Sequence, residues 1–209
     1  MDLSIYSEDE RVLVSAASLG FTVVVLNKVV TNFQHIPKFP IVKNEKIVVL
    51  NRVTFVISHA SQIAMIDLRN FHANIFSLRP ANEQVLKFIL DKEITNFHVI
   101  SLDLAQPLLS MGMRAGMKKL ISLGVCFEVE FAPLLRDAHV RGICVNQCRL
   151  VLNTFADGII FSSGAKNALE LRSAFDLDVF AAGVLGLRGN PSKNAQKLVE
   201  TILRFMETY

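Results

Sequence analysis

The sequence contains no tryptophan, only two tyrosines and only three cysteines among its 209 residues. Cys126, Cys144 and Cys148 are too few for the disulfide framework on which small secreted domains depend. Cys144 and Cys148 stand four residues apart in an expected helix, a spacing at which two thiolates can share a metal ion. No histidine or aspartate lies beside them at ligand spacing, so we interpret them as buried structural thiols.

No apolar run reaches the length of a membrane span. The longest uncharged stretch, residues 12–27, is interrupted by Ser15, Ser18, Gly20 and Thr22. The N-terminus lacks the basic and apolar regions of a signal peptide, so we expect the protein to stay inside the cell, with no membrane partner. The hydrophobic fraction of 51% and mean hydropathy of +0.39 then indicate a buried α/β core, with room for one large partner surface.

The sequence also lacks the common motifs of catalysis. It has no Gly-x-Ser-x-Gly elbow, no P-loop and no Gly-rich dinucleotide fingerprint. Neither His-x-His nor His-x-x-x-His occurs among the five histidines, which are His35, His59, His72, His98 and His139. We therefore expect no catalytic residues, no metal site and no cofactor in this chain alone.

Short apolar segments alternate with helical patterns along the whole chain. Seven strands are expected, at residues 2–5, 21–26, 46–57, 73–78, 97–102, 125–131 and 158–161. Helices are expected after Ser7, after Ser61 and after Asn82, and over residues 112–123, 140–155 and 179–187, with a last one opening at Asn190 and Pro191. Residues 31–44 are expected to form a loop or a poorly formed helix. This alternation predicts a single α/β domain over residues 1–209, a TIM-type barrel with seven parallel strands and surrounding helices.

One stretch near the end of the barrel pattern has the features of an anion site. The strand at 158–161 breaks into Ser162, Ser163 and Gly164, which allow a tight turn with free backbone N–H groups. Lys166 follows at once, and Arg172 comes shortly afterwards. The stretch is either a seat for phosphate or an ordinary turn between a strand and a helix.

Cations recur where the expected strands end or the helices begin. They are Lys28, Arg52, Arg79, Arg114, Lys118, Lys166 and Arg172. Placed on one face of a barrel, they would suit the phosphates of a folded RNA; otherwise they are scattered surface charge. The net charge of +3 is compatible with an RNA partner and does not by itself imply one.

Arg52 differs from the other cations because it lies inside an apolar strand. A charge there requires either a bend that exposes it or an internal ion pair. Glu128 and Glu130 alternate along one strand, so they share a face and could be its partners. The sequence leaves both roles open for Arg52, an RNA-facing one and an internal ion pair.

Several segments resemble one known family. They are residues 19–27 (Leu-Gly-Phe-Thr-Val-Val-Val-Leu-Asn), 50–54 (Leu-Asn-Arg-Val-Thr), 127–133 (Phe-Glu-Val-Glu-Phe-Ala-Pro) with Arg136-Asp137, 160–165 (Ile-Phe-Ser-Ser-Gly-Ala), 169–172 (Leu-Glu-Leu-Arg), Asp178-Val179 and Leu185-Gly186-Leu187. Together they resemble the TIM-barrel, thirty-kilodalton protein subunit of ribonuclease P and ribonuclease MRP from archaea and eukaryotes. The similarity extends over nearly the whole chain.

The resemblance implies a barrel of the polymerase-and-histidinol-phosphatase type that has lost its metal site. It implies a non-catalytic subunit of a ribonucleoprotein in which RNA is the catalyst for maturing the 5′ end of tRNA, with a possible role in rRNA processing. The implied partners are ribonuclease P or MRP RNA, precursor tRNA through the complex, a small Pop-type α/β-sandwich subunit and other subunits. The implied location is the nucleus or nucleolus in a eukaryote and the cytoplasm in an archaeon.

The resemblance also implies roles for individual residues. RNA-facing or scaffold roles are carried over to residues in matching motifs, which are Arg52, Ser162, Ser163 and Arg172. RNA binding by Arg79, Arg114, Lys118 and Lys166 rests on their expected places in the barrel. The chain departs from the family in its short first strand and in lacking the basic tail of larger members, so RNA contacts made by such a tail are not expected.

Two other functions remain open from the sequence. The first is a metal-dependent phosphoesterase of the same barrel superfamily, with His59, His98 and Glu128 as an atypical centre. The second is a pure protein-interaction scaffold, which would bind partners without salt-sensitive RNA affinity.

Overall fold

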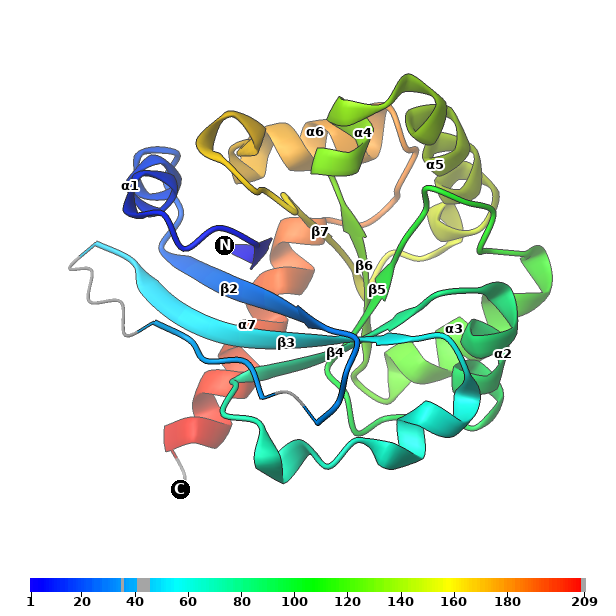
Figure 1. Ribbon diagram of the computed structural model, residues 1–209. Coiled ribbons are helices and arrows are strands. Elements are labelled where there is room, and N and C mark those ends of the chain that lie inside the picture. The colour runs from blue at the N-terminus through cyan, green and yellow to red at the C-terminus, as the bar shows by residue number, and fades with distance from the viewer. Residues whose placement is uncertain (35, 41–45, 208–209) are drawn as a thin grey trace.

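We describe the protein from a computed structural model, which describes residues 1–34, 36–40 and 46–207. Seven strands form one parallel sheet in the order of the sequence. They are β1 (Asp2–Ile5), β2 (Val23–Val30), β3 (Val48–Ile57), β4 (Ile75–Pro80), β5 (Val99–Leu102), β6 (Cys126–Glu130) and β7 (Ile159–Ser162). β1 and β7 meet through an isolated bridge between Ile5 and Ala165, so the sheet curls into a nearly closed barrel surrounded by helices (Figure 1). The expected seven-stranded TIM-type barrel is confirmed.

The connections contain the helices that the apolar periodicity predicts. The α-helices are α1 (Glu10–Ser18), α2 (Glu83–Asp91), α3 (Arg114–Ser122), α4 (Ala132–Arg136), α5 (Ala138–Leu150), α6 (Ala174–Gly183) and α7 (Pro191–Glu207). Short 3-10 helices are η1 (Ala60–Met65), η2 (Leu68–Asn70), η3 (Met111–Met113), η4 (Leu152–Thr154) and η5 (Ala168–Glu170). None of the described helices is both long and apolar enough to cross a membrane.

Hydrogen bonds at helix ends account for several differences from the expected boundaries. Asp9, and not Ser7, caps α1, because its carboxylate accepts from the backbone N–H of Arg11. Ser173 caps α6 through the N–H of Asp176, so this helix begins five residues earlier than expected. The segment after Ser61 winds as the 3-10 helix η1. In the expected loop, residues 31–34 and 36–40 are neither helix nor strand, and residues 35 and 41–45 lie outside the described part.

The expected helix over 140–155 is divided into α5 and η4, and of the residues whose apolar character favours an inward position, Val151 and Leu152 are buried and Leu150 is not. Leu150 is 48% exposed, whereas α5 buries Cys144, Gln147 and Cys148. The Gln147 side chain accepts from the backbone N–H groups of Leu108 and Leu109, so it fixes the loop after β5 against α5. Both cysteines are buried free thiols, as expected.

The barrel interior is apolar at the end where the strands begin. There the inward-facing residues of all seven strands form one cluster, made of Leu3, Val23, Val25, Leu50, Ile75, Val99, Cys126 and Ile160, against α7. α7 crosses this opening from β7 towards β4: Asn194 donates to the carbonyl of Ile159, and Met206 contacts Asn74 (Figure 1). The last helix therefore closes one end of the barrel and leaves the other end available for a site.

Replacement of Leu198 by alanine tests the role of α7. Leu198 is buried against the barrel interior, so Leu198→Ala should lower the free energy of unfolding by about 2–4 kcal/mol. Urea denaturation measures the loss. Lys193→Ala, at an exposed position of the same helix, is the control and should change stability by less than about 0.5 kcal/mol. Equal stability of the two variants would show that α7 is not part of the core.

Candidate functional site

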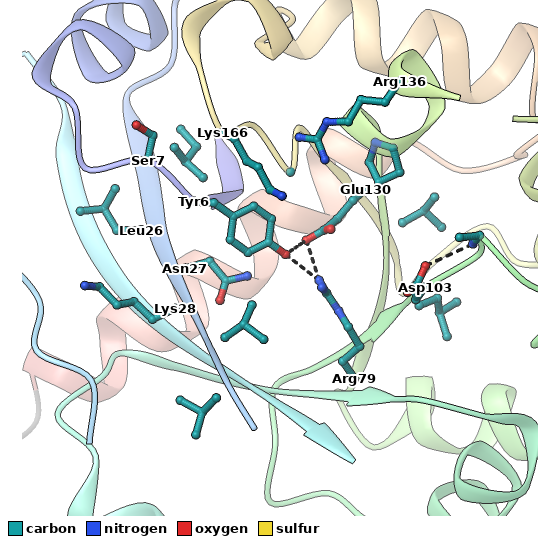
Figure 2. A pocket seen from close by; sticks show the side chains of 18 of the residues that line it. Tyr6, Ser7, Leu26, Asn27, Lys28, Arg79, Asp103, Glu130, Arg136 and Lys166 are labelled. Atoms are coloured by element: carbon teal, nitrogen blue, oxygen red, sulfur yellow. Dashed lines mark hydrogen bonds and ion pairs between the residues drawn. The ribbon is translucent and has the colours of Figure 1, made fainter. Parts of the chain in front are cut away.

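A cavity of about 1120 Å³ opens at the end of the barrel where the strands finish. Tyr6 and Glu130 lie at its floor with Arg79 (Figure 2). The basic side chains in its lining are Lys28, Lys38, Arg79, Arg136 and Lys166, and the acidic ones are Glu8, Asp103 and Glu130. This is the end of a TIM-type barrel at which functional sites are built.

Polar side chains lie directly below this cavity because the inward-facing pattern of the strands changes. One step of two residues beyond the apolar layer, Val25 is followed by Asn27, Leu50 by Arg52 and Cys126 by Glu128. The same step leads to Ser77 in β4, Ser101 in β5 and Ser162 in β7, and all six polar side chains are buried. The middle of the barrel is therefore a polar layer.

An ion pair between Arg52 and Glu128 occupies the centre of this layer. Nη1 and Nη2 of Arg52 lie 2.6 Å from Oε1 and Oε2 of Glu128, and both side chains are 0% exposed. The remaining guanidinium N–H groups donate to Thr54 Oγ1, the Leu3 carbonyl and Ser77 Oγ. All five donors of the arginine are used, which is the condition under which a buried charge is tolerated.

The two groups of this pair keep their charges. Burial would raise the pKa of Glu128, but the charge of Arg52 and hydrogen bonds from Arg52 and Ser162 hold that pKa below its usual value. Burial opposes the charged form of Arg52 as well, and the carboxylate of Glu128 outweighs it and raises the pKa of Arg52. The internal ion pair is thus the role that the structure supports for Arg52.

A second charged group, at the floor of the cavity, consists of Tyr6, Arg79 and Glu130. Glu130 Oε1 accepts from Arg79 Nη2 at 2.8 Å, from Ser4 Oγ at 2.8 Å and from the Tyr6 hydroxyl. Burial, followed by the charge of Glu130, raises the pKa of Tyr6, so the phenol stays protonated and donates. Figure 2 shows these three side chains pointing toward one another below Lys166.

Asp2 is a buried carboxylate beside this layer. Its Oδ1 accepts from the backbone N–H groups of Ser4 and Ser163, while Oδ2 is buried without a hydrogen bond from the described residues. Burial raises its pKa from 3.8 to about 6, and the hydrogen bonds from Ser163 and Ser4 only partly oppose this rise. Asp2 is therefore a buried acid that gains its proton at a higher pH than an exposed aspartate does.

Several backbone N–H groups of the turn after β7 are bound within the protein. The N–H of Ser163 is bound to Asp2, that of Ala165 to Ser163 Oγ and that of Lys166 to Glu170. These backbone donors are satisfied within the protein. The expectation of free N–H groups is therefore corrected for Ser163, Ala165 and Lys166.

The residues expected to meet RNA separate into three sets: buried, lining the cavity, and away from the cavity. Arg52, Ser162 and Ser163 are at most 1% exposed, so direct contact with RNA does not fit their placement and a scaffold role does. Arg79 and Lys166 both line the cavity. Of these two, Arg79 is tied to Glu130 and Lys166 is exposed.

Arg114, Lys118 and Arg172 are not among the residues that line the cavity. Arg114 and Lys118 lie on α3, where Arg114 donates to the carbonyl of Leu150. Arg172 donates to the carbonyls of Leu169 and Leu171, with its guanidinium 5.9 Å from the ring centre of Phe131. Its contacts hold the segment between η5 and α6.

The sequence reasoning missed two cations of the cavity, Lys38 and Arg136. Lys38 lies in a connection with no periodic pattern, so no sequence signal placed it. Arg136 comes six residues after β6, where a parallel strand leads to the barrel mouth, and that position could have identified it. Its guanidinium forms an ion pair at 2.6 Å with Glu170.

The proposed metal centre of His59, His98 and Glu128 is not assembled. Both oxygens of Glu128 are bound to Arg52. His98 lies just before β5, and its Nδ1 accepts from the backbone N–H of Phe76 in β4. His59 is exposed and follows the far end of β3. Within the described residues no group of three His, Cys, Asp or Glu side chains could hold an ion.

Comparison with known proteins identifies the family. A family described as "RNase P subunit p30" matches residues 1–208. The chain belongs to this family. Membership supports a ribonuclease P protein subunit over a free-standing phosphoesterase.

Individual proteins match this chain at low sequence identity. The "Probable ribonuclease P protein subunit 3" of Schizosaccharomyces pombe is 28% identical over 165 residues, which cover 76% of this chain and 69% of that protein. Protein GAMETOPHYTE DEFECTIVE 1 of Arabidopsis thaliana is 26% identical over 136 residues, 63% of this chain and 23% of that much longer protein. A chain from a structure of archaeal ribonuclease P with mature tRNA shares the fold with a TM-score of 0.67 at 13% identity, covering 97% of this chain and 90% of that one.

The raised pKa of Asp2 predicts a pH dependence of stability. The folded state binds this proton more tightly than the unfolded chain does. Its favourable contribution is complete below pH 3.8 and is lost as the pH rises through about 6. The difference between the two pKa values corresponds to about 3 kcal/mol.

This prediction is checked by urea denaturation of the wild type and Asp2→Asn between about pH 3.5 and pH 7. The variant removes the titrating group, so the stability of the wild type relative to the variant should fall across that range. A constant difference at all pH values would contradict the raised pKa.

Proposed function

We propose that this chain is a non-catalytic protein subunit of ribonuclease P, with ribonuclease MRP as a second possible assembly, in which RNA performs the cleavage that matures the 5′ end of tRNA. The observation that carries the proposal is the family match over residues 1–208. The fission yeast relative named as a ribonuclease P subunit adds support. In this role the protein works where the RNA works, in the nucleus of a eukaryote or the cytoplasm of an archaeon.

The rim of the barrel mouth is the part that we assign to RNA. We define the rim by its four cations, Lys28, Lys38, Arg136 and Lys166, all of which line the cavity. Lys28 is paired with Glu8 and Arg136 with Glu170. Lys38 and Lys166 are exposed, and the structure pairs neither ammonium group with any residue it describes. Two unpaired lysines on one rim suit RNA phosphates, which bind cations with little dependence on sequence.

A separate apolar surface is assigned to a protein subunit. α6 buries Leu177 and Ala181, yet Phe175 is 75% exposed and Val179 54% exposed on the same helix. Leu169, just before it on η5, is 86% exposed. Exposed apolar side chains that lie close together mark an interaction surface, and α6 lies on the outside of the barrel (Figure 1). We assign this α6 surface to the small Pop-type α/β-sandwich subunit.

Affinity purification from the protein's own cells tests the function. The tagged chain is recovered, the RNA that accompanies it is sequenced, and the eluate is assayed for 5′ processing of precursor tRNA. Enrichment of one structured RNA together with processing activity is the expected result. A preparation that contains partners but no RNA would support the scaffold alternative and contradict the proposal.

Loss of the two unpaired rim lysines should weaken RNA binding. Lys38→Ala/Lys166→Ala removes two phosphate contacts, so the slope of log affinity against log salt should fall by about 2. Binding of the RNA recovered above is measured by filter retention at several salt concentrations. Lys92→Ala/Lys193→Ala removes the same charge from exposed positions at the end of α2 and on α7 and is the matched control. Equal slopes for the two double variants would exclude the rim.

Substitution on α6 should affect the protein partner and leave RNA contacts at the rim intact. Phe175→Ser removes an exposed aromatic side chain from the α6 surface, and such anchors carry much of the binding energy at interfaces. Size-exclusion chromatography of the chain co-expressed with its small subunit should show at least about a tenfold weaker complex. Leu123→Ser, at an exposed position beside α3, should not weaken it. The same weakening by both variants would contradict the assignment.

A further inference from the structure

The cavity of the barrel mouth is larger than a contact with an RNA backbone requires. Phosphates bound to rim lysines would lie at its edge, whereas the volume of about 1120 Å³ extends inward to Tyr6 and Arg79. Cavities of roughly 300–1,000 Å³ are typical of sites for small molecules. The interior therefore has the capacity for a ligand, and its lining indicates which chemistry that ligand has.

The floor of the cavity offers a carboxylate oxygen that is not used by the protein. Glu130 accepts hydrogen bonds from Ser4, Tyr6 and Arg79 through Oε1 alone, and Oε2 accepts none from the described residues. Oε2 is not among the buried unsatisfied atoms of the described chain, so it is accessible from the cavity.

Gly164 keeps this oxygen open. A Cβ at position 164 would lie 2.9 Å from Glu130 Cβ and 3.2 Å from Oε2, and the φ of +59° also favours glycine. An accessible carboxylate oxygen accepts hydrogen bonds from hydroxyl groups, as carboxylates do for the ribose in dinucleotide sites. The floor is therefore suited to a sugar.

Cations stand on the same side of the cavity as this oxygen. Figure 2 shows the Lys166 amine pointing toward the group formed by Tyr6, Glu130 and Arg79, with Arg136 nearby. The ammonium of Lys166 has no hydrogen bond or ion pair with the described residues, so it can bind an anion without breaking an existing contact. A phosphate beside a hydroxyl-bearing sugar satisfies both features.

Apolar side chains form another part of the cavity lining. They are Leu102, Leu104, Val129, Leu134 and Val140. Side chains of this kind remove a flat apolar group from water, and Asp103 beside them accepts from the N–H of Ala105 through Oδ1. A nucleobase attached to the sugar is a group of this kind.

We propose that the barrel mouth binds a nucleoside 5′-phosphate. Sugar hydroxyls donate to Glu130 Oε2, the phosphate binds Lys166, and the base lies against the wall formed by Leu134 and Val140. The ligand is either a free nucleotide or the phosphorylated 5′ end of an RNA chain, which share this chemistry. The proposal deepens the assignment of the rim to RNA, but it concerns the interior of the cavity and can fail separately.

Calorimetric titration of the purified full chain tests the proposal. AMP, GMP, CMP and UMP are compared with adenosine, which lacks the phosphate, and with inorganic phosphate, which lacks the sugar and the base. At least one monophosphate should bind about tenfold more tightly than both adenosine and inorganic phosphate. No binding of any monophosphate, or equal binding of phosphate alone, would overturn the proposal.

Two variants place the ligand within the cavity. Lys166→Ala should weaken binding of the monophosphate about tenfold, and Val140→Phe should do the same by filling the apolar wall while leaving inorganic phosphate unaffected. Lys118→Ala on α3 is the control, and urea denaturation confirms that each variant is folded. Unchanged nucleotide binding in both cavity variants would overturn the proposed position.

RNA oligonucleotides with and without a 5′-phosphate distinguish the two sources. If the phosphorylated oligonucleotide competes with AMP, the ligand is the 5′ end of an RNA chain. If AMP binds without such competition, the ligand is a free nucleotide. Either result supports the site. If RNA is recovered with the protein from cells but the purified chain binds no nucleotide, this inference alone is overturned. If the purified chain binds a nucleotide but no RNA is recovered from cells, the proposed function alone is overturned.

Discussion

The barrel is organised around one buried ion pair, Arg52 with Glu128. Transfer of two charges from water into a protein interior costs several kcal/mol per ion. The contact is compatible with a stable fold because it is bidentate and because every guanidinium N–H has a partner. These partners come from β1, β3, β4 and β6, so the pair joins strands on opposite sides of the barrel.

The position of this pair determines what each end of the barrel can do. On one side the interior is apolar and is closed by α7. On the other side the next inward-facing acid is Glu130, which is held by Arg79 and Tyr6 at the floor of an open cavity. Since Glu128 is occupied by Arg52, Glu130 is the acid that the floor of the cavity offers to a ligand. The fold thus offers charge and hydrogen bonds at the mouth while its centre remains internally satisfied.

Much of this architecture could be predicted from the sequence. Apolar segments short enough for strands, separated by helical periodicity, gave all seven strands and their barrel arrangement. The charge of Arg52 inside an apolar strand indicated a special position. Glu128 and Glu130 were both predicted as possible partners for an ion pair. The choice between an RNA-facing role and an ion pair required the barrel to close, because the partner lies 76 residues away in sequence.

The remaining differences arise from contacts that sequence patterns do not contain. Ser162 and Ser163 follow a strand end, as functional residues often do, but Asp2 approaches from the other end of the chain and occupies the Ser163 N–H. Lys38 reaches the mouth from an aperiodic connection. Leu150 has the apolar character of an inward residue, yet α5 turns Gln147 inward because its amide satisfies the loop after β5. In each case tertiary hydrogen bonding decides the outcome.

A double-mutant cycle at Arg52 and Glu128 tests the central claim most directly. The cycle consists of Arg52→Met, Glu128→Leu and the combined variant, each measured by urea denaturation. Each single change leaves a buried charge unpaired and should cost about 3–5 kcal/mol, whereas the double change should cost several kcal/mol less than the sum of the two. Strictly additive losses would show that the two side chains do not depend on each other and would contradict the account.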